Sequence, residues 1–128
     1  MALYLDSPKP EITVEANDLE LDIDTAVPLG LIANELMTNA SKYVFPAAEN
    51  PVLLLRLEEL GNGQYQLTAT DNGPGLPDGF DASKAKSLGL RLVNRLSDQL
   101  FGEVAYRNDN GAVIEVRFKD TAARKEED

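Results

Sequence analysis

The sequence predicts an α/β fold, a two-layer sandwich in which a mixed, mostly antiparallel sheet is covered on one face by helices. Two segments carry apolar residues at helical spacing, and the segments between them alternate apolar and polar residues as strands do. Two glycine-containing turns join successive strands as hairpins. Because the later strands have one apolar and one polar face, we expect the helices on one side of the sheet only.

The length and composition fit one folded domain. The chain has 128 residues, and hydrophobic residues make up 43% of them, which is enough for one core and argues against a disordered chain. We expect an irregular lead-in over residues 1–10, the folded domain over residues 11–119, and a charged flexible tail over residues 120–128.

The first elements are extended and lead into a helix. Residues 11–16 alternate as a strand does, and a short second extended piece is expected at residues 19–23. Asp24 or Thr25 can cap the helix that follows, and Pro28 is tolerated in its first turn. We therefore expect the first helix to begin at these residues.

The first helix is the best-defined element and extends to about residue 44. Phe45-Pro46 ends it, because a residue that precedes proline avoids the helical conformation. The apolar side chains that recur at helical spacing are Leu29, Ile32, Ala33, Leu36, Met37, Ala40 and Val44.

A hairpin and a long loop follow the first helix. Strands are expected at residues 52–59 and 64–71, joined by Gly61-Asn62-Gly63. Residues 72–86 are rich in glycine, proline and polar residues, so we expect a loop there. The side chains of the second strand that face the core are predicted to be Tyr65, Leu67, Ala69 and Asp71.

A second helix and a second hairpin complete the domain. The helix is expected over about residues 87–101. Strands at residues 103–107 and 112–119 are joined by Asp109-Asn110-Gly111. The apolar stripe of the second helix is predicted to be Leu92, Val93, Leu96 and Leu100.

The composition excludes several kinds of site. The chain has no cysteine and no histidine, so disulfides, thiolate nucleophiles, sulfur-based zinc sites and Ser/His catalysis are all excluded. Any metal must therefore be a hard cation held by oxygen.

The charge and hydropathy bound the partners. The net charge is −10 and we see no basic face, so we expect no nucleic-acid partner. No apolar run approaches the roughly 20 residues that cross a bilayer, and the first residues lack the basic start and apolar stretch of a secretion signal. We therefore expect no direct membrane insertion and a cytoplasmic location. The acids near the start of the chain indicate a solvated face, the alternative being a docking surface for a basic partner.

The polar edge of the first helix is a candidate site. Glu35, Asn39 and Lys42 are spaced i, i+4 and i+7, so they share a line beside the apolar stripe, at the rim between core and solvent. A carboxylate, an amide oxygen and an ammonium there suit a polarised water or hydroxyl, Mg²⁺ and a phosphate. The alternative is an ordinary amphipathic helix with a Glu/Lys surface pair.

The segment Asp71-Asn72-Gly73-Pro74-Gly75 is a second candidate. Asp71 falls on the core face at the end of its strand, where a carboxylate is unfavourable unless it accepts hydrogen bonds. An adenine amino group, helped by water, is one such donor. Gly73 and Gly75 would let the backbone approach a flat ring or adopt positive φ. The alternative is a tight turn in which Asp71 caps its own backbone.

The start of the second helix, Ser87-Leu88-Gly89-Leu90-Arg91, is a third candidate. A turn of small residues that enters a helix presents free amides and the positive end of the dipole to a phosphate. The alternative is a capped helix start with a glycine that serves packing.

In order and spacing these three segments resemble the ATP-binding domain shared by histidine kinases, gyrase, MutL-type repair proteins and heat-shock chaperone ATPases. The resemblance extends over about residues 11–119. Over longer stretches around these segments, the sequence is similar to a bacterial sensor-kinase branch with a nonstandard, histidine-bearing dimerisation domain. The matching segments are residues 34–43 for the N box, 71–75 for the G1 box and 87–93 for the G2 box.

The resemblance implies a role for each matching residue. Glu35 would be the general base or its polarising equivalent, and Asn39 would ligate Mg²⁺ that bridges the phosphates of ATP. Asp71 would hold the adenine amino group. Gly73 and Gly75 would form the adenine-side wall and the hinge of a lid.

The phosphate side is implied in the same way. Lys42 and Tyr43 would reach phosphate or ribose, and residues 76–88 would form a mobile ATP lid. The G2-box residues expected at the nucleotide are Leu88, Gly89, Leu90 and Arg91.

Three departures from the family pattern bear on the expected activity. Arg91 stands where many relatives carry a second glycine, and it either supplies a charge to the phosphates or reflects the branch. Ala112 replaces a hydroxyl residue that often follows the glycine before the last strand, which would take a partner from Asp71 and weaken nucleotide binding. The chain has no histidine that could accept phosphate.

The resemblance implies the catalytic domain of a two-component sensor histidine kinase. Such a domain would transfer the γ-phosphate of ATP to a histidine on a separate dimerisation domain of the same or a partner chain, with a response regulator downstream. It would not autophosphorylate alone. Two alternatives stay open: an anti-sigma-type serine protein kinase with a similar N box, and a non-catalytic nucleotide-binding or scaffold domain with a decayed site.

Overall fold

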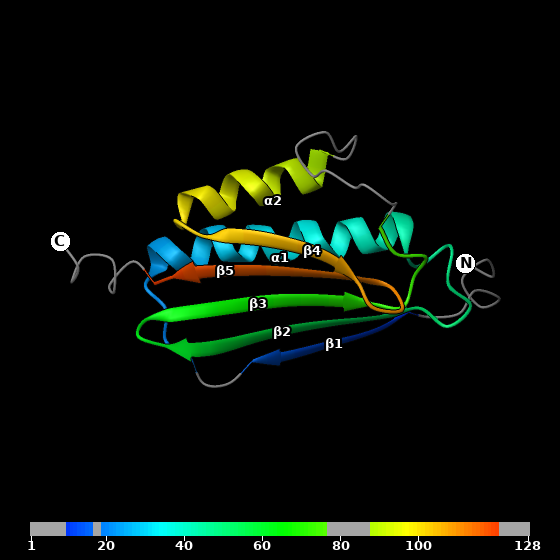
Figure 1. The fold of residues 1–128 in the computed structure, drawn as a ribbon, viewed down its shortest axis with the longest axis horizontal. Coiled ribbons are helices and arrows are strands. Elements are labelled where there is room, and N and C mark those ends of the chain that lie inside the picture. Colours follow the sequence, from blue (N-terminus) through cyan, green and yellow to red (C-terminus); the bar gives the residue numbers. More distant parts are fainter. Residues whose placement is uncertain (1–9, 17–18, 77–87, 121–128) are drawn as a thin grey trace, which may run out of the picture.

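Five strands form one sheet, and two helices lie against one of its faces (Figure 1). The computed structural model describes residues 10–16, 19–76 and 88–120. The elements are β1 (Glu11–Ala16), α1 (Ile23–Tyr43), β2 (Val52–Gly61), β3 (Gln64–Asp71), α2 (Leu88–Gln99), β4 (Glu103–Asn108) and β5 (Ala112–Lys119).

The sheet is mixed and mostly antiparallel, as predicted. Its strand order is β1-β2-β3-β5-β4, and only β1 and β2 run parallel. Both predicted hairpins are present, and their turns contain residues with positive φ, Asn62 in the first and Asn110 in the second. Because β3 and β5 are antiparallel neighbours, the end of β3 and the start of β5 lie side by side at one end of the sandwich (Figure 1).

The first helix begins earlier than predicted. α1 starts at Ile23, so this residue is helical rather than the end of the extended piece expected at residues 19–23, and residues 19–22 belong to no strand. The carbonyl of Asp22 accepts the first hydrogen bond of the helix from the N–H of Thr25, at 2.9 Å. Thr25 lies inside the helix, whose N-cap is Asp22, so it does not cap the helix, and its side chain is fully buried. Pro28 consequently lies in the second turn rather than the first.

The core lies between the two helices and the sheet. Side chains of α1 meet alternate residues of the middle strands, as the periodicity of helices and strands requires. Tyr65 and Phe118 stack with their ring centroids 5.8 Å apart. The buried apolar residues of α1 are Leu29, Ile32, Leu36 and Ala40, and Val44, which follows the helix, is buried as well. The buried residues of β3 and β5 include Leu67, Ala69, Ile114 and Val116.

The second helix buries a stripe that differs from the predicted one. Leu90 and Ser97 face the core, whereas Leu92 is only half-buried. Ser97 is 1% exposed, and because it is polar it interrupts the apolar pattern at a core position. The predicted core positions Val93 and Leu100 are correct.

The helices leave part of the apolar surface uncovered. Val14 of β1 lies opposite Leu55 of β2, yet Leu55 is buried and Val14 is 66% exposed. On α1, Ile23, Val27 and Leu31 are also exposed at helical spacing. Neither α1 nor α2, the two helices in the described ranges, is long and apolar enough to cross a membrane.

Candidate functional site

The row of polar residues on α1 lies at the rim of the core, as its spacing predicted. Glu35 and Asn39 are half-buried, and Lys42 is exposed. The Oδ1 atom of Asn39 is buried, yet no donor within the described residues reaches it. Because a buried oxygen without a donor costs about 1–3 kcal/mol, this atom calls for a partner that the described polypeptide does not supply.

The amide oxygen of Asn39 has the chemistry that a hard cation requires. Mg²⁺ and Ca²⁺ take oxygen ligands, including side-chain amide oxygens. The described residues contain no group of three or more acidic side chains that would hold a metal by themselves. A cation at Asn39 would therefore take most of its ligands from water or from a bound molecule that carries its own oxygens.

Asp71 ends β3, and one of its two carboxylate oxygens is fully engaged with the backbone. Oδ1 accepts a hydrogen bond from the N–H of Gly73 at 2.9 Å and another from the N–H of Ala112 at 3.1 Å. Both bonds go to the same oxygen, so the side chain is held in one orientation. The other carboxylate oxygen, Oδ2, can accept a hydrogen bond from a donor other than these two N–H groups.

The turn between β4 and β5 packs directly against the end of β3. Gly111 has φ +141°, and a Cβ atom at this position would collide with the backbone carbonyl oxygen of Asp71. Glycine is therefore required here both for backbone conformation and for space. This close approach is what brings the N–H of Ala112 within reach of Asp71.

The segment that follows β3 also contacts the end of α1. Val44, which follows the last helical residue, lies against Gly73, and a Cβ atom on Gly73 would be 3.0 Å from Cγ1 of Val44. The helix that carries Asn39 therefore ends beside the segment that carries Asp71. This contact brings the first two candidate segments to the same end of the sandwich.

Asn72 fastens this segment to the start of β2. Its Oδ1 accepts from the N–H of Val52 at 2.8 Å, and its Nδ2 donates to the carbonyl of Asn50 at 2.7 Å. The sequence pattern indicates only a turn at this asparagine, so this fastening role is a finding of the structure.

Asn108 fastens the same segment from the opposite side. Its Oδ1 accepts from the N–H of Leu76 at 2.7 Å, and its Nδ2 donates to the carbonyl of Leu76 at 2.9 Å. Gly75 has φ +84°, and a Cβ there would lie 2.8 Å from Oδ1 of Asn108. Nothing in the sequence beyond proximity to a turn distinguishes Asn108, so sequence reasoning does not find it.

The third candidate segment is described only in part. Leu90 is buried in the core, so its side chain does not face a ligand, and Arg91 is exposed on the first turn of α2. The side chains of Tyr43 and Leu88 and the burial of Gly89 lie outside what the structure describes, as does most of the lid expected over residues 76–88.

Comparison with known proteins assigns the family. Residues 24–122 match the family described as histidine kinase-, DNA gyrase B- and HSP90-like ATPases. The chain belongs to this ATPase family. The matched span includes all three candidate segments, from the polar row on α1 to the start of α2.

The relatives of this ATPase domain include sensor histidine kinases. The chain is 28% identical over 107 residues to blue-light-activated histidine kinase 2 of Erythrobacter litoralis, covering 83% of this chain and 31% of that protein. It is 37% identical over 90 residues to the sensor histidine kinase PdtaS of Mycobacterium tuberculosis, covering 69% of this chain and 18% of that protein. The chain therefore spans less than a third of the length of these two relatives.

Solved structures share the fold. The histidine kinase domain of the Erythrobacter litoralis blue-light-activated kinase superposes with a TM-score of 0.80 at 25% identity, covering 91% of this chain and 54% of that one. The Acinetobacter baumannii histidine kinase AdeS superposes with a TM-score of 0.74 at 20% identity, covering 94% of this chain and 59% of that one. The α/β sandwich is thus the fold of histidine kinase catalytic domains.

One departure from the family pattern lies directly at Asp71. Ala112 lacks the hydroxyl that the family pattern often places here, so its side chain offers Asp71 no hydrogen bond. Its main-chain N–H, which any residue at this position would also have, donates to Oδ1 of Asp71 at 3.1 Å. Weaker nucleotide binding through Ala112 stays a prediction.

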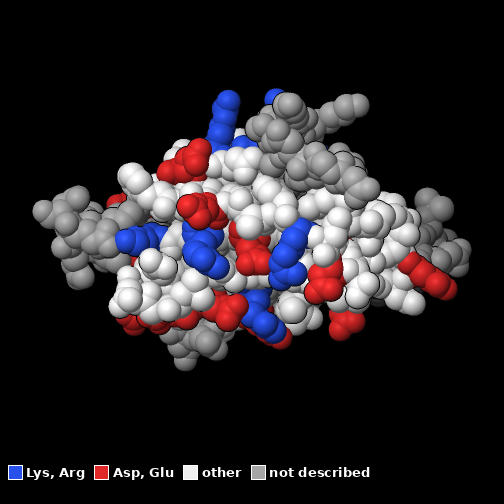
Figure 2. Space-filling model, in the orientation of Figure 1, with Lys and Arg blue, Asp and Glu red and all other residues white. Residues whose placement is uncertain are grey.

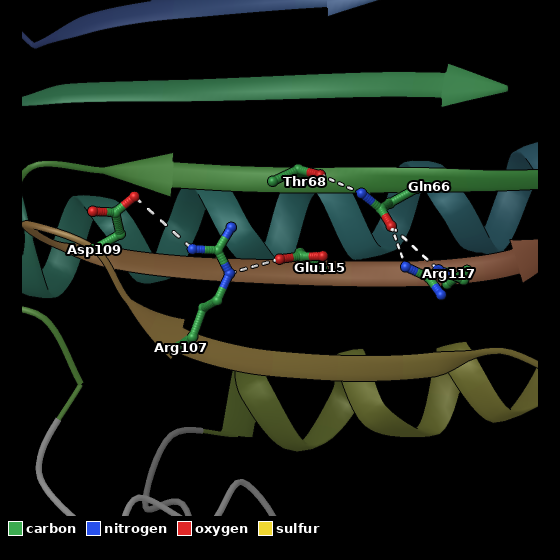
Figure 3. A network of polar contacts seen from close by, with 6 residues as sticks. All are labelled: Gln66, Thr68, Arg107, Asp109, Glu115 and Arg117. Atoms are coloured by element: carbon green, nitrogen blue, oxygen red, sulfur yellow. Dashed lines mark hydrogen bonds and ion pairs between the residues drawn. The ribbon is translucent and has the colours of Figure 1, made fainter. Parts of the chain in front are cut away.

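The face of the sheet opposite the helices carries a different set of polar groups (Figure 2). Arg107 pairs with Glu115 at 2.8 Å, and Arg117 donates to Oε1 of Gln66 at 3.1 and 3.2 Å (Figure 3). Arg56, Gln66, Arg107 and Glu115 are among the residues that line a hollow of about 250 Å³ on this face. Because Arg56 and Arg107 already have acidic partners, these two side chains offer little free positive charge to a polyanion.

Tyr106 is the described group whose pKa is most clearly displaced. Burial raises the pKa of Tyr106 to about 12, and its hydroxyl donates a hydrogen bond to Oδ1 of Asn94 at 2.9 Å. The bond joins β4 to α2. Tyr106 therefore serves the packing of the ATPase domain rather than proton transfer near neutral pH.

Proposed function

We propose that this chain is the ATP-binding catalytic domain of a two-component sensor histidine kinase. It transfers the γ-phosphate of ATP to a histidine on a separate dimerisation domain. The family match and the kinase relatives support this proposal over a serine kinase or a scaffold.

The carboxylate of Asp71 is the observation that carries the proposal. Two backbone N–H groups saturate Oδ1, so the orientation of the side chain is fixed before any ligand binds. Oδ2 then accepts a hydrogen bond from the exocyclic amino group of adenine. Gly73 and Gly75 place backbone rather than side chains along the rim, which leaves room for the flat ring.

Asn39 provides the metal side of the site. Its buried Oδ1 fits Mg²⁺, and phosphate oxygens and water would supply the other ligands. Mg²⁺, when bound, neutralises charge that develops on the phosphates during transfer. The side chain of Asn39 holds this end of the nucleotide while Asp71 holds the other.

The remaining residues serve the phosphates. Lys42 and Tyr43 follow Asn39 at the end of α1 and reach the phosphates or the ribose. At the start of α2, the backbone amides at Leu88, Gly89 and Leu90 face the phosphates, since amides at a helix N-terminus bind anions. Leu90 contributes only its backbone, because its side chain is in the core. Arg91 adds a positive charge on the same turn.

Glu35 is the proposed base. A nitrogen of the acceptor histidine attacks the γ-phosphorus, the bond from phosphorus to the bridging oxygen breaks, and ADP leaves. Glu35 accepts or polarises the imidazole proton as this happens. Most of the catalysis comes from positioning and charge neutralisation, because phosphoryl transfer needs little covalent help from the protein.

The phosphoacceptor must come from elsewhere, since the chain contains no histidine. We place it on a helical dimerisation domain of the parent chain or of a partner chain, in the cytoplasm, with a response regulator as the next acceptor. The sensor kinases in this family are much longer than this chain, which leaves room for such a domain.

Phosphoryl transfer in trans tests the proposal. The chain is mixed with γ-labelled ATP, Mg²⁺ and a separately purified dimerisation domain of a sensor kinase. We expect an acid-labile, base-stable phosphate on that domain, lost when its histidine is replaced. An acid-stable phosphoserine on a protein substrate would instead favour the serine kinase.

A further inference from the structure

Asn108 holds the backbone of Leu76 as a neighbouring strand would. One side chain satisfies both polar groups of that residue, accepting from its N–H at 2.7 Å and donating to its carbonyl at 2.9 Å. An asparagine side-chain amide carries an acceptor oxygen and an NH₂ donor group, so it can bind both backbone groups of one residue. The two residues are 32 positions apart, so the contact fixes a tertiary arrangement.

Gly75, which precedes Leu76, leaves room for this contact. Gly75 adopts φ +84°, a conformation that other residues rarely take. A Cβ there would lie 2.8 Å from Oδ1 of Asn108 and would push the amide away. Gly75 therefore admits the side chain of Asn108, a role that its place in a glycine-rich segment does not reveal.

The β4–β5 hairpin thus holds both ends of one short segment. Asn108 pairs with Ala112 in the register of the two strands. Ala112 donates to Asp71 at the beginning of the segment, and Asn108 binds Leu76 at its end. The intervening backbone, which includes Gly73 and Gly75, is fixed between these two attachments.

We propose that Asn108 is a positioning residue for the adenine pocket. This inference rests on the proposed function, in which the segment from Asp71 to Leu76 forms the adenine side of the site. Asn108 does not touch the nucleotide. It restricts the conformations of this segment before binding, and thereby removes an ordering cost that adenine would otherwise have to meet.

The proposal predicts which ligands are affected. Losing two hydrogen bonds to the backbone lets the segment sample other conformations, so affinity for any adenine-bearing ligand should fall by about tenfold. The loss should be the same for adenosine, ADP and Mg-ADP. The gain in affinity that Mg²⁺ gives to ADP should stay unchanged, because Asn39 lies on α1.

Calorimetric titration of Asn108→Ala with adenosine, ADP and Mg-ADP tests this. Asn110→Gly is the matched control, since it removes an exposed asparagine from the same turn while keeping a residue that tolerates its φ of +55°. We expect about a tenfold rise in Kd for all three ligands in Asn108→Ala and no change in Asn110→Gly. A lower melting temperature with unchanged Kd values would reduce Asn108 to a structural residue and overturn the proposal.

Hydrogen exchange in the unaltered protein gives a test that does not depend on the variant's folding. The amide of Leu76, which donates to Asn108, should exchange slowly and should slow further when ADP is added. If ADP binds but leaves this amide unaffected, the proposed link between Asn108 and the pocket is wrong. If the unaltered chain binds no ADP at all, the proposed function itself fails.

Discussion

The backbone N–H of Ala112 donates a 3.1 Å hydrogen bond to Oδ1 of Asp71, joining residues 41 positions apart. The bond comes from the main chain, so its existence does not depend on the side chain at position 112. It depends instead on the preceding residue, because only glycine at position 111 lets the turn come this close to Asp71. The hydrogen bond from Ala112 that helps to orient Asp71 therefore depends on Gly111.

Gly111→Ala is predicted to destabilise the fold and the site together. The new Cβ would collide with the carbonyl oxygen of Asp71, and alanine is strained at φ +141°. We expect a loss of about 2 kcal/mol or more in the free energy of unfolding, measured by urea denaturation.

Gly30→Ala is the control for this substitution. Gly30 lies within α1 with nothing within 4 Å of its Cβ position, so alanine should stabilise the helix by about 0.5–1 kcal/mol. A Gly111→Ala protein as stable as the parent would contradict the geometry described for the turn.

Asn39→Ala is predicted to remove the contribution of Mg²⁺ while sparing adenine recognition. The buried Oδ1 is the proposed ligand, whereas Asp71 acts at the other end of the nucleotide. Calorimetry with ADP, with and without Mg²⁺, should show that the metal no longer strengthens binding. Asn34→Ala, an exposed position on the same helix, should keep the full effect. Equal losses for metal-free and metal-bound ADP in Asn39→Ala would count against the metal assignment.

Ser97→Ala is predicted to leave the free energy of unfolding unchanged or raise it by about 1 kcal/mol. The Oγ atom of Ser97 is buried without a partner in the described residues, so removing it relieves a desolvation cost. The comparison is Ser41→Ala at an exposed position of α1, where only helix propensity changes. A clear drop in the melting temperature of Ser97→Ala alone would mean that the hydroxyl does have a partner.

The folded protein is predicted to lose stability at high pH through Tyr106. Its folded-state pKa of about 12 lies above the unfolded value of 10.0, so the unfolded state releases this proton first. The associated stability is present below pH 10 and is lost as the pH rises toward 12. Urea denaturation across this range should show a shallower decline for Tyr106→Phe than for the parent. Identical pH dependence of both proteins would argue against the raised pKa.

Much of the fold could be predicted because its signals are local. The turn Gly61-Asn62-Gly63 and the alternation that follows it fix a hairpin, and this places Asp71 at the end of an inward-facing strand. The predicted start of α1 is wrong because Ile23 fits a strand as well as a helix. The predicted stripe of α2 is partly wrong because a polar residue, Ser97, occupies a core position.

The supports of the site could not be predicted in the same way. Asn72 and Asn108 bind backbone groups that lie 20–32 positions away in the sequence. Every residue has such backbone groups, so the pattern of side chains does not indicate which of them an asparagine will bind. Gly111 is recognisable as a turn residue, but its contact with Asp71 depends on how the second hairpin packs against the first. Such contacts follow from tertiary packing rather than from periodicity.

Calorimetric titration of Asp71→Asn with ADP tests most directly whether Asp71 binds the adenine of ATP. The substitution keeps an oxygen that can accept from Gly73 and Ala112, but it replaces Oδ2 with an NH₂ group that faces the adenine amino group donor to donor. Circular dichroism should show an intact fold. We predict that the parent binds ADP and that the variant shows no detectable binding, a loss of at least about a hundredfold. Unchanged affinity in a folded Asp71→Asn protein would contradict the account.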